Sequence, residues 1–458
     1  PNNQERTNML PIEKLLAPLH GQMTWANLQL FSHLIAAFFA VRYQITTRSL
    51  SRYCDYSVRQ IFRFLKDEHP WVMIRLSLFE TFCYSSRKQY IAAVDEVVEG
   101  KSGKHTHGLS RFYSSLSQKS IPSICFFGLS LIDVTARTAY TLGMQQVVYT
   151  DEDKQRHAES KKRRAAGKKR VRDGAPLPKG RRPGSKNKDK SDTTESASLR
   201  TFKALWSEVM TVLRLQLAEI RVSHLVADSA YATLAYLQSA LQHKCYLISK
   251  LKSNAALYSP YSGQQKAKGP RRIYGDRIDL TAIDEKYLRS TSTKGDETLK
   301  VYQFPAYSKA MPRIVLNVVV IVIIGKNGKQ KIAVLFSNDT ALDATTMMEY
   351  YSLRFQIEFE FRDAKQHFGL SDFKNYKKEN ITTMVNLCFT MDTISKILLA
   401  SIREKTGNSK ISVLDLKILF NARFQAHSII KLLRKNGYSI SYCDWIELYY
   451  PNDMININ

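Results

Sequence analysis

Three acidic residues lie where the chain could assemble an active site. Asp95 interrupts an apolar stretch, Asp228 ends a second one, and Glu358 lies in a segment with helical spacing. Side chains at the ends of neighbouring strands project into one crevice of an α/β sheet, and a helical Glu packed across them completes the group. We therefore expect these three carboxylates to share one site.

A cluster of three carboxylates suits metal-dependent cleavage of phosphodiesters. Hard oxygen ligands bind Mg²⁺ or Mn²⁺. Two such ions about 3.5–4 Å apart can activate the attacking oxygen and stabilise the leaving one. Without a cation the carboxylates repel one another and raise their own pKa values. The expected cofactor is two Mg²⁺ ions, with Mn²⁺ also accepted.

Each acid also has an ordinary structural explanation. Asp228, followed by Ser and Ala, fits a turn or a helix N-cap. Asp95 fits a charge on an edge strand. Its neighbour Glu96 is an alternative ligand, although the alternation of a strand directs it to the opposite face.

The segment around Glu358 strengthens the catalytic interpretation. Tyr351, Arg354, Glu358 and Lys365 fall within an arc of about 60° on a continuous helix. An apolar stripe beside them anchors such a helix on the core: Leu353, Ile357, Phe361, Ala364 and Phe368. The alternative is an ordinary ion pair between Arg354 and Glu358, four residues apart on an amphipathic helix.

The spacing Tyr-x2-Arg-x3-Glu-x6-Lys resembles the signature of the insertion-sequence-four superfamily of bacterial DDE transposases. Two further segments resemble the regions of the first and second Asp in that superfamily: Ala93-Val-Asp95 with the following Lys101-Ser-Gly-Lys104, and Val226-Ala-Asp228-Ser-Ala-Tyr231. Together the similar segments span about residues 45–370, which is most of the chain.

The resemblance implies an α/β fold with an RNase H-like catalytic core, a β-rich insertion and helical flanks. It implies that Asp95, Asp228 and Glu358 bind the metal ions. Tyr351, Arg354 and Lys365 are then expected to contact transposon-end DNA near the cleaved phosphate, and Lys101 and Lys104 to bind DNA as well. The implied chemistry is hydrolysis that frees a 3′-hydroxyl, which then attacks target DNA in cut-and-paste transposition of an insertion sequence.

The net charge independently predicts a polyanionic partner. The chain has 68 Lys and Arg against 41 Asp and Glu, a formal charge of +27. Residues 154–190 alone contain 16 Lys and Arg and three acids. We expect a mobile or disordered basic insert over 150–195. Within it, Arg181 and Arg182 resemble minor-groove hooks, and the alternative is a nonspecific phosphate-binding loop.

The elements that must position these residues divide the chain into five parts. Residues 1–85 are predicted to be a helical DNA-binding domain, in which Thr47–Leu65 has the outline of a helix-turn-helix that offers Arg59 and Arg63 to DNA. A basic helical hairpin without groove contact is the alternative. The remaining parts are the first core segment 86–251, a β-strand insertion 252–336, the Glu-bearing core segment 337–369 and a C-terminal helical region 370–458.

Several element boundaries follow from periodicity. Strands are predicted at 90–98, 124–133 and 139–149, followed by a β-α-β alternation over 199–251. The insertion is predicted to contain strands at 299–304, 314–324 and 331–336. Helices are predicted at 340–368, 381–405 and 412–435, with Gly407 and Gly437 ending the last two.

Composition also limits the cellular setting. The six cysteines contain no CxxC pair, which favours a reducing intracellular compartment. The apolar run Ile314–Ile324 is too short to span a bilayer. We expect a cytoplasmic, nucleoid-associated bacterial protein with no membrane contact. Its expected partners are double-stranded DNA, as terminal inverted repeats and target, and a second copy in a synaptic homodimer.

Two other classes of protein remain as alternatives. The main one is a non-catalytic, sequence-specific DNA-binding protein or a domesticated relative that uses the same basic surface. Another RNase H-like nuclease, such as a resolvase, predicts cleavage without joining and leaves the β insertion unexplained. An NTPase is rejected because Gly100-Lys101-Ser102 lacks the preceding glycine of a phosphate-binding loop.

Overall fold

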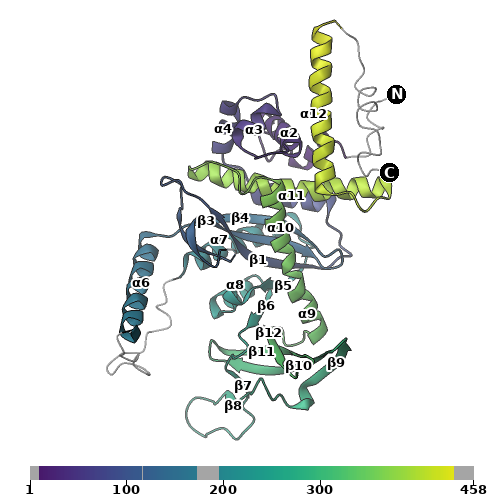
Figure 1. Ribbon diagram of the computed structural model, residues 1–458. Coiled ribbons are helices and arrows are strands. Elements are labelled where there is room, and N and C mark those ends of the chain that lie inside the picture. The colour runs from purple at the N-terminus through teal and green to yellow at the C-terminus, as the bar shows by residue number, and fades with distance from the viewer. Residues whose placement is uncertain (1–9, 116, 173–194, 438–458) are drawn as a thin grey trace.

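The computed structural model describes residues 10–115, 117–172 and 195–437. One mixed sheet of 12 strands runs through the described part of the chain, with helices gathered at one end of the molecule and around the half of the sheet that carries Asp95 and Asp228 (Figure 1). The strand order is β2-β3-β1-β5-β6-β12-β11-β10-β7-β8, with β4 paired to β3 and β9 to β10.

The half of the sheet that positions the candidate acids has the order β4-β3-β1-β5-β6. Its strands are β1 (Tyr90–Gly100), β3 (Lys119–Asp133), β4 (Thr138–Val147), β5 (Val222–Ala227) and β6 (Tyr246–Leu251). The first three form an antiparallel meander, which β2 (Ser110–Ser114) extends at one end, and β5 and β6 follow parallel to β1. The α/β, RNase H-like fold class expected from the sequence is confirmed.

Both faces of this half-sheet are buried because the side chains of β1 alternate between two apolar cores. Ile91 and Ala93 pack on the side of α10 (Phe355–His367) and α11 (Lys378–Thr406). Ala92 and Val94 pack on the side of α7 (Ala197–Gln216) and α8 (Leu234–Gln242). A strand covered on both faces reads as a continuous apolar run, as 90–94 does.

The β insertion continues the core sheet instead of forming a sheet of its own. Its strands are β7 (Leu257–Pro260), β8 (Tyr274–Arg277), β9 (Leu288–Lys294), β10 (Glu297–Ser308), β11 (Met311–Ile324) and β12 (Gln330–Ser337). β12 pairs antiparallel with β6, with Phe336 opposite Ser249. β11 and β12 form an antiparallel hairpin, and Gly328 adopts a φ of 66° in its turn. The insertion is thus tied directly to the strand that follows Asp228.

The N-terminal region is helical, as predicted. It contains α1 (Ile12–Leu16), α2 (Trp25–Ala40), α3 (Thr47–Arg52), α4 (Val58–Lys66) and α5 (Trp71–Phe82). Ser57 caps α4 in a capping box with Gln60, which fixes where this helix begins. The helix-turn-helix outline of α3 and α4 is therefore present.

The basic insert is partly a helix, so the expected loop is wrong over its first part. α6 (Asp151–Arg172) is rich in Lys, Arg and Ala, which are good helix formers, and the first proline of the insert comes only at Pro176. Its first turn carries acids that suit the helix dipole. Asp153 joins that turn to Thr150 and to Arg200 at the start of α7. Arg181 and Arg182 lie outside the described residues.

The predicted long helix 340–368 is divided into α9 (Ala344–Leu353) and α10 at Arg354. The N–H of Arg354 turns to the carbonyl of Tyr351 at 3.2 Å, and its φ of −50° and ψ of −35° remain right-handed. The chain therefore makes one tight turn and then resumes as a helix. This break changes the stripe that a continuous helix would present.

The C-terminal described helices are α11 and α12 (Val413–Lys435). Gly407 ends α11 in the left-handed conformation, as its position predicted. α11 is the one helix in the described chain that is long and apolar enough to cross a membrane, but 83% of the apolar window is buried inside the fold. Its apolar residues form the core beneath α10.

Candidate active site

Asp95 and Asp228 lie side by side because their strands are parallel neighbours. Val94 of β1 is in register with Ala227 of β5, so the next residue of each strand reaches the same end of the sheet. Asp228 stands before the short 3-10 helix Ser229–Tyr231, but its carboxylate makes no capping hydrogen bond. The N-cap explanation for Asp228 is therefore not supported.

Asp95 is held in place by its neighbours. Its Oδ1 accepts hydrogen bonds from the Glu96 N–H at 2.8 Å and from the Tyr231 hydroxyl at 3.4 Å. Its Oδ2 accepts a hydrogen bond from Arg354 at 3.2 Å. Because β1 lies between β3 and β5, the edge-strand explanation for this acid is wrong.

Glu96 points to the other face of the sheet, as strand alternation predicted. Burial raises the pKa of Glu96, and hydrogen bonds with Ser198 of α7 and Cys125 of β3 oppose that rise. These partners belong to the face opposite α10. Glu96 is therefore separated by the sheet from the group around Asp95.

Arg354 lies among all three candidate acids. Its side chain is only 8% exposed, and its Nη1 is 3.2 Å from Asp95 Oδ2 and 2.8 Å from Glu358 Oε1. Burial lowers the pKa of Arg354, but the charges of Asp95, Glu358 and Asp228 outweigh it and raise the pKa overall. The guanidinium thus serves as the counter-ion of this acidic site.

The site keeps an excess of negative charge despite Arg354. Burial raises the pKa of Asp95 to about 6, and the charges of Glu358 and Asp228 add to the rise while Arg354 opposes it. Asp95 is one-fifth exposed and Glu358 is 42% exposed. Water and small ions therefore have access to a site where one cation faces three carboxylates.

The residues fit an oxygen-liganded divalent cation by donor chemistry, although Arg354 occupies the position between them. Within the described ranges, no three His, Cys, Asp or Glu side chains are grouped closely enough to hold a metal ion. The raised pKa of Asp95 marks a carboxylate that an added cation would stabilise in its charged form. Metal binding here requires the Arg354 side chain to move aside.

Tyr351 and Lys365 flank this group in different ways. The ring of Tyr351 lies 6.0 Å from the Arg354 guanidinium, and burial raises the pKa of Tyr351. Lys365 lies two turns after Glu358 on α10. Its Nζ is 2.7 Å from Glu99 and 3.2 Å from the Val98 carbonyl. The structure brings Tyr351, Arg354 and Glu358 together and places Lys365 against the end of β1.

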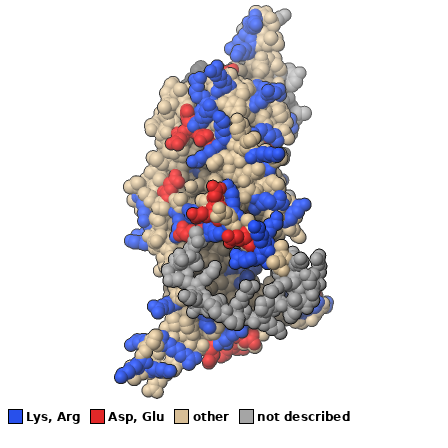
Figure 2. All heavy atoms as spheres, turned by 90° about the vertical axis from the view of Figure 1, so that its left-hand side faces the viewer, with Lys and Arg blue, Asp and Glu red and all other residues tan. Residues whose placement is uncertain are grey.

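The predicted basic residues occupy separate surfaces. Lys101 donates to the Phe373 carbonyl at 2.7 Å, and burial lowers the pKa of Lys101 to about 8. Lys104 is exposed in the loop after β1, and Arg59 and Arg63 are exposed on α4. Figure 2 shows Lys and Arg side chains spread over the face that it presents, with Asp and Glu gathered mainly near its middle.

Some residues of this region escaped sequence reasoning. Tyr231 has a direct partner in Asp95, and its place in the Val226–Tyr231 segment was the available signal. Glu360 is buried, accepts from Ser130 at 2.5 Å and lies 3.0 Å from Lys396. Its offset of two residues from Glu358 places it on the opposite side of α10, which the helical period could have indicated.

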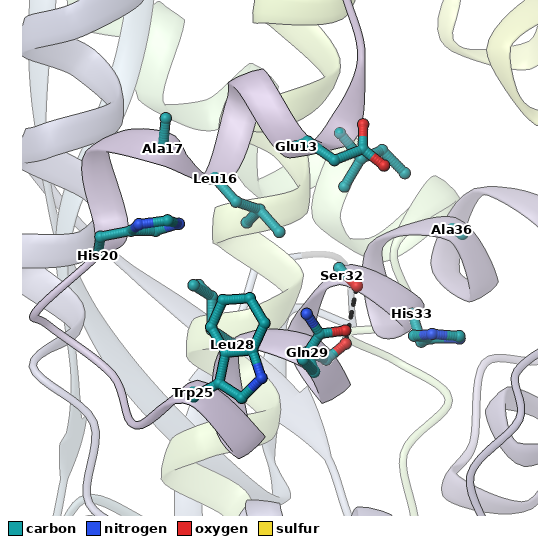
Figure 3. Close-up of a pocket in the computed structure, with 11 residues that line it drawn as sticks. Glu13, Leu16, Ala17, His20, Trp25, Leu28, Gln29, Ser32, His33 and Ala36 are labelled. Carbon is teal, nitrogen blue, oxygen red and sulfur yellow. Dashed lines mark hydrogen bonds between the residues drawn. The ribbon is translucent and has the colours of Figure 1, made fainter.

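A separate cavity of about 450 Å³ lies between α1 and α2, lined by Leu16, Trp25 and Leu28 among others (Figure 3). None of the three candidate acids lines it. It therefore makes no contribution to the acidic site.

Of the comparisons with known proteins, the family match points the same way as the site. A search of curated proteins found no match. A cryo-EM structure of a piggyBac transposase synaptic complex with hairpin DNA is 13% identical, with 98% of this chain and 82% of that chain covered and a TM-score of 0.37. The family model described as "Transposase DDE domain" matches residues 199–391, a segment that contains Asp228 and Glu358. Over that segment, which is less than half of the chain, this protein is similar to the transposase DDE domain, and the match supports a transposase function.

Proposed function

We propose that this protein is a DDE transposase of the insertion-sequence-four superfamily that moves an insertion sequence by cut-and-paste. The observation that carries the proposal concerns Arg354, whose guanidinium contacts Asp95 of β1 and Glu358 of α10 and whose pKa is also raised by the charge of Asp228 at the end of β5. The family match over 199–391 supports the same class of enzyme.

Each side chain of the site has a distinct role in this proposal. Asp95, Asp228 and Glu358 would hold the Mg²⁺ ions, and bound ions would supply activation of the attacking oxygen and stabilisation of the leaving oxygen. Tyr231 orients Asp95 through its hydroxyl. Arg354, released from the carboxylates, and the neighbouring Tyr351 bind the DNA phosphate beside the cleaved bond.

DNA is the substrate that the charge and the site favour. The formal charge of +27 supports binding to a polyanion, and exposed arginines on α4 extend the basic surface to the N-terminal helices. We propose that terminal inverted repeats and target DNA are both bound, and that two copies form the synaptic complex. The proposed setting is the bacterial cytoplasm.

The experiment is incubation with DNA that carries the element's own ends, in Mg²⁺ and separately in Ca²⁺, with nicks and joined products scored. Asp95→Asn, Asp228→Asn and Glu358→Gln should each abolish both products in Mg²⁺ and keep DNA binding. Asp363→Asn, which removes a carboxylate of α10 that pairs with Arg362, is the matched control and should stay active.

Two outcomes would contradict the proposal. Full activity in any one of the three variants removes that residue from the site. Wild-type protein that binds end DNA but yields neither product in Mg²⁺ or Mn²⁺ indicates the alternative function, a DNA-binding protein without catalysis.

A further inference from the structure

A second polar site lies at the loop that follows α10, away from the three carboxylates. Lys374, Asn375 and Tyr376 line two neighbouring cavities of about 640 and 540 Å³. The first cavity opens toward the loop after β1, and the second toward α3 and α4. We call this pair of cavities the 374–376 groove.

The lining of the 374–376 groove is basic throughout. Lys101 and Lys104 contribute to the first cavity, and Arg48, Lys66 and Lys377 to the second. Neither cavity is lined by an Asp or a Glu. A groove with several lining cations and no lining acid attracts an anion.

Asn375 provides a neutral donor in the shared wall of the groove. The residue is only 8% exposed, and its Nδ2 has no hydrogen-bond partner. Buried amide groups are normally paired, so this amide still has the capacity to donate to an acceptor oxygen.

The groove is held rigid by hydrogen bonds from three directions. The Ile45 N–H donates to Asp372 at 2.9 Å, which ties the loop to the N-terminal helices. Ser371 donates to Glu99 at 3.0 Å, and the His107 N–H donates to the Tyr376 carbonyl at 2.8 Å. Glu99 also pairs with Lys365, so one chain of contacts joins the groove to α10.

We propose that the 374–376 groove binds the sugar-phosphate backbone of duplex DNA and guides the duplex from α4 to the catalytic half of the sheet. The Lys and Arg side chains neutralise the phosphates, and the Asn375 amide donates to a phosphate oxygen. Arg59 and Arg63 are exposed on α4, the helix that contributes Lys66 to the second cavity. The choice of DNA as the ligand rests on the proposed function. An acidic peptide is another anion that the same charges would attract, and the test below distinguishes it from DNA.

The test measures binding of a short fluorescent duplex of arbitrary sequence to the full chain, by anisotropy in EDTA at several KCl concentrations. The double variant Lys374→Gln/Lys377→Gln should weaken binding and reduce the salt slope by about one to two. Asn375→Ala removes a neutral donor, so it should weaken binding about fivefold to tenfold without changing the slope.

Two controls separate the groove from charge in general and from folding. Lys329→Gln/Lys331→Gln removes the same charge from exposed positions at the turn between β11 and β12 and should bind more tightly than the groove variant. Asn375→Asp places a carboxylate among lysines, so it should retain the thermal stability of the wild type but lose more affinity than Asn375→Ala.

The outcomes distinguish this proposal from the proposed function. Groove variants that bind no worse than the Lys329/Lys331 control, or Asn375→Asp with wild-type affinity, overturn the groove alone. Tight duplex binding through the groove in a protein that never cleaves end DNA overturns the catalytic function and leaves the groove standing. A wild-type chain that binds no duplex overturns both proposals. An acidic peptide that displaces bound duplex from the wild type but not from the Lys374→Gln/Lys377→Gln variant would replace DNA as the ligand.

Discussion

Arg354 makes the contact that its spacing predicts and one further contact that no sequence pattern predicts. Its spacing to Glu358 predicts an ion pair along a helix, and the resemblance predicts a DNA contact. The structure shows the ion pair and adds Asp95, from a strand more than two hundred residues earlier. Arg354 therefore links the helical acid to the strand acid.

The role of Arg354 as counter-ion leads to a prediction about thermal stability. Arg354→Gln leaves the three carboxylates without their counter-ion, so the melting temperature in EDTA should fall. The expected loss in the free energy of unfolding is about 1–3 kcal/mol. Mn²⁺ should raise the melting temperature of the variant more than that of the wild type, because in the variant the metal ion does not compete with a guanidinium for the carboxylates. Below about pH 6, Asp95 is protonated, so Arg354→Gln should lower the melting temperature in EDTA by less than it does at higher pH.

Arg403→Gln is the control for that measurement. It removes a guanidinium that donates to the Ile411 carbonyl, so its melting temperature should respond to Mn²⁺ as the wild type does. An Arg354→Gln protein that gains no more from Mn²⁺ than the wild type would show that the carboxylates do not share a cation site.

At the scale of elements, α10 is fixed by a buried ionic group on the side away from Glu358. Lys396 of α11 lies 3.0 Å from Glu360 and 2.7 Å from Asp392, and it donates to the Ala139 carbonyl of β4. Ser130 of β3 donates to the other oxygen of Glu360. This network joins α10 to α11 and to two strands, so it sets the position from which Glu358 reaches the site.

The network predicts a dependence of stability on pH. Burial raises the pKa of Asp392 to about 7, although Lys396 opposes the rise. Because the pKa of Asp392 is higher in the folded protein than in the unfolded chain, the stability that Asp392 contributes is present below about pH 4. That contribution is lost as the pH rises to about 7. Asp392→Asn removes that loss, so its free energy of unfolding should exceed that of the wild type by about 2–4 kcal/mol at pH 8 and by little at pH 4.

Chemical unfolding at a series of pH values measures this difference. Lys396→Met is the companion variant: it leaves Glu360 buried without its cation and should destabilise the protein at every pH. Parallel curves for Asp392→Asn and wild type between pH 4 and pH 8 would show that Asp392 is ionised in the folded protein throughout that range.

At the scale of the whole molecule, the N-terminal helices meet the catalytic half of the sheet at the loop after α10. Gly369 adopts a φ of 78°, and a Cβ at this position would lie 2.5 Å from the Ile45 Cβ. The Ile45 N–H donates to Asp372 in the same loop. The close approach of these two segments therefore depends on a residue without a side chain.

Gly369→Ala should consequently cost more than an ordinary glycine substitution. Both Gly369 and Gly407 have positive φ, but nothing lies within 4 Å of a Cβ added at Gly407. Gly407→Ala should cost about 1–2 kcal/mol from backbone strain alone, and Gly369→Ala about 1–3 kcal/mol more because Ile45 must shift. Urea unfolding of both variants measures the difference, and equal losses would show that the contact between Gly369 and Ile45 is not tight.

The sequence by itself determined most of the local structure. The α/β class, the strands of the meander, the β-α-β unit, the capped α4 and the glycine end of α11 all follow from periodicity and capping within short segments. Asp95 and Asp228 stood out for a similar reason, because the first interrupts an apolar stretch and the second ends one, whereas Glu358 stood out by its spacing within a helix. The mobile insert predicted over 150–195 is wrong over 151–172, because Lys, Arg and Ala favour a helix in spite of the high charge.

Only the tertiary structure decided which of these elements meet. The pairing of β12 with β6, the break of the helix at Arg354, the position of that guanidinium among three carboxylates and the unpaired amide of Asn375 depend on segments far apart in the chain. Spacing within one element reports which side chains share its face. Burial, charge pairing and close backbone approach arise only when separate faces pack together, and these decide what the candidate site can bind.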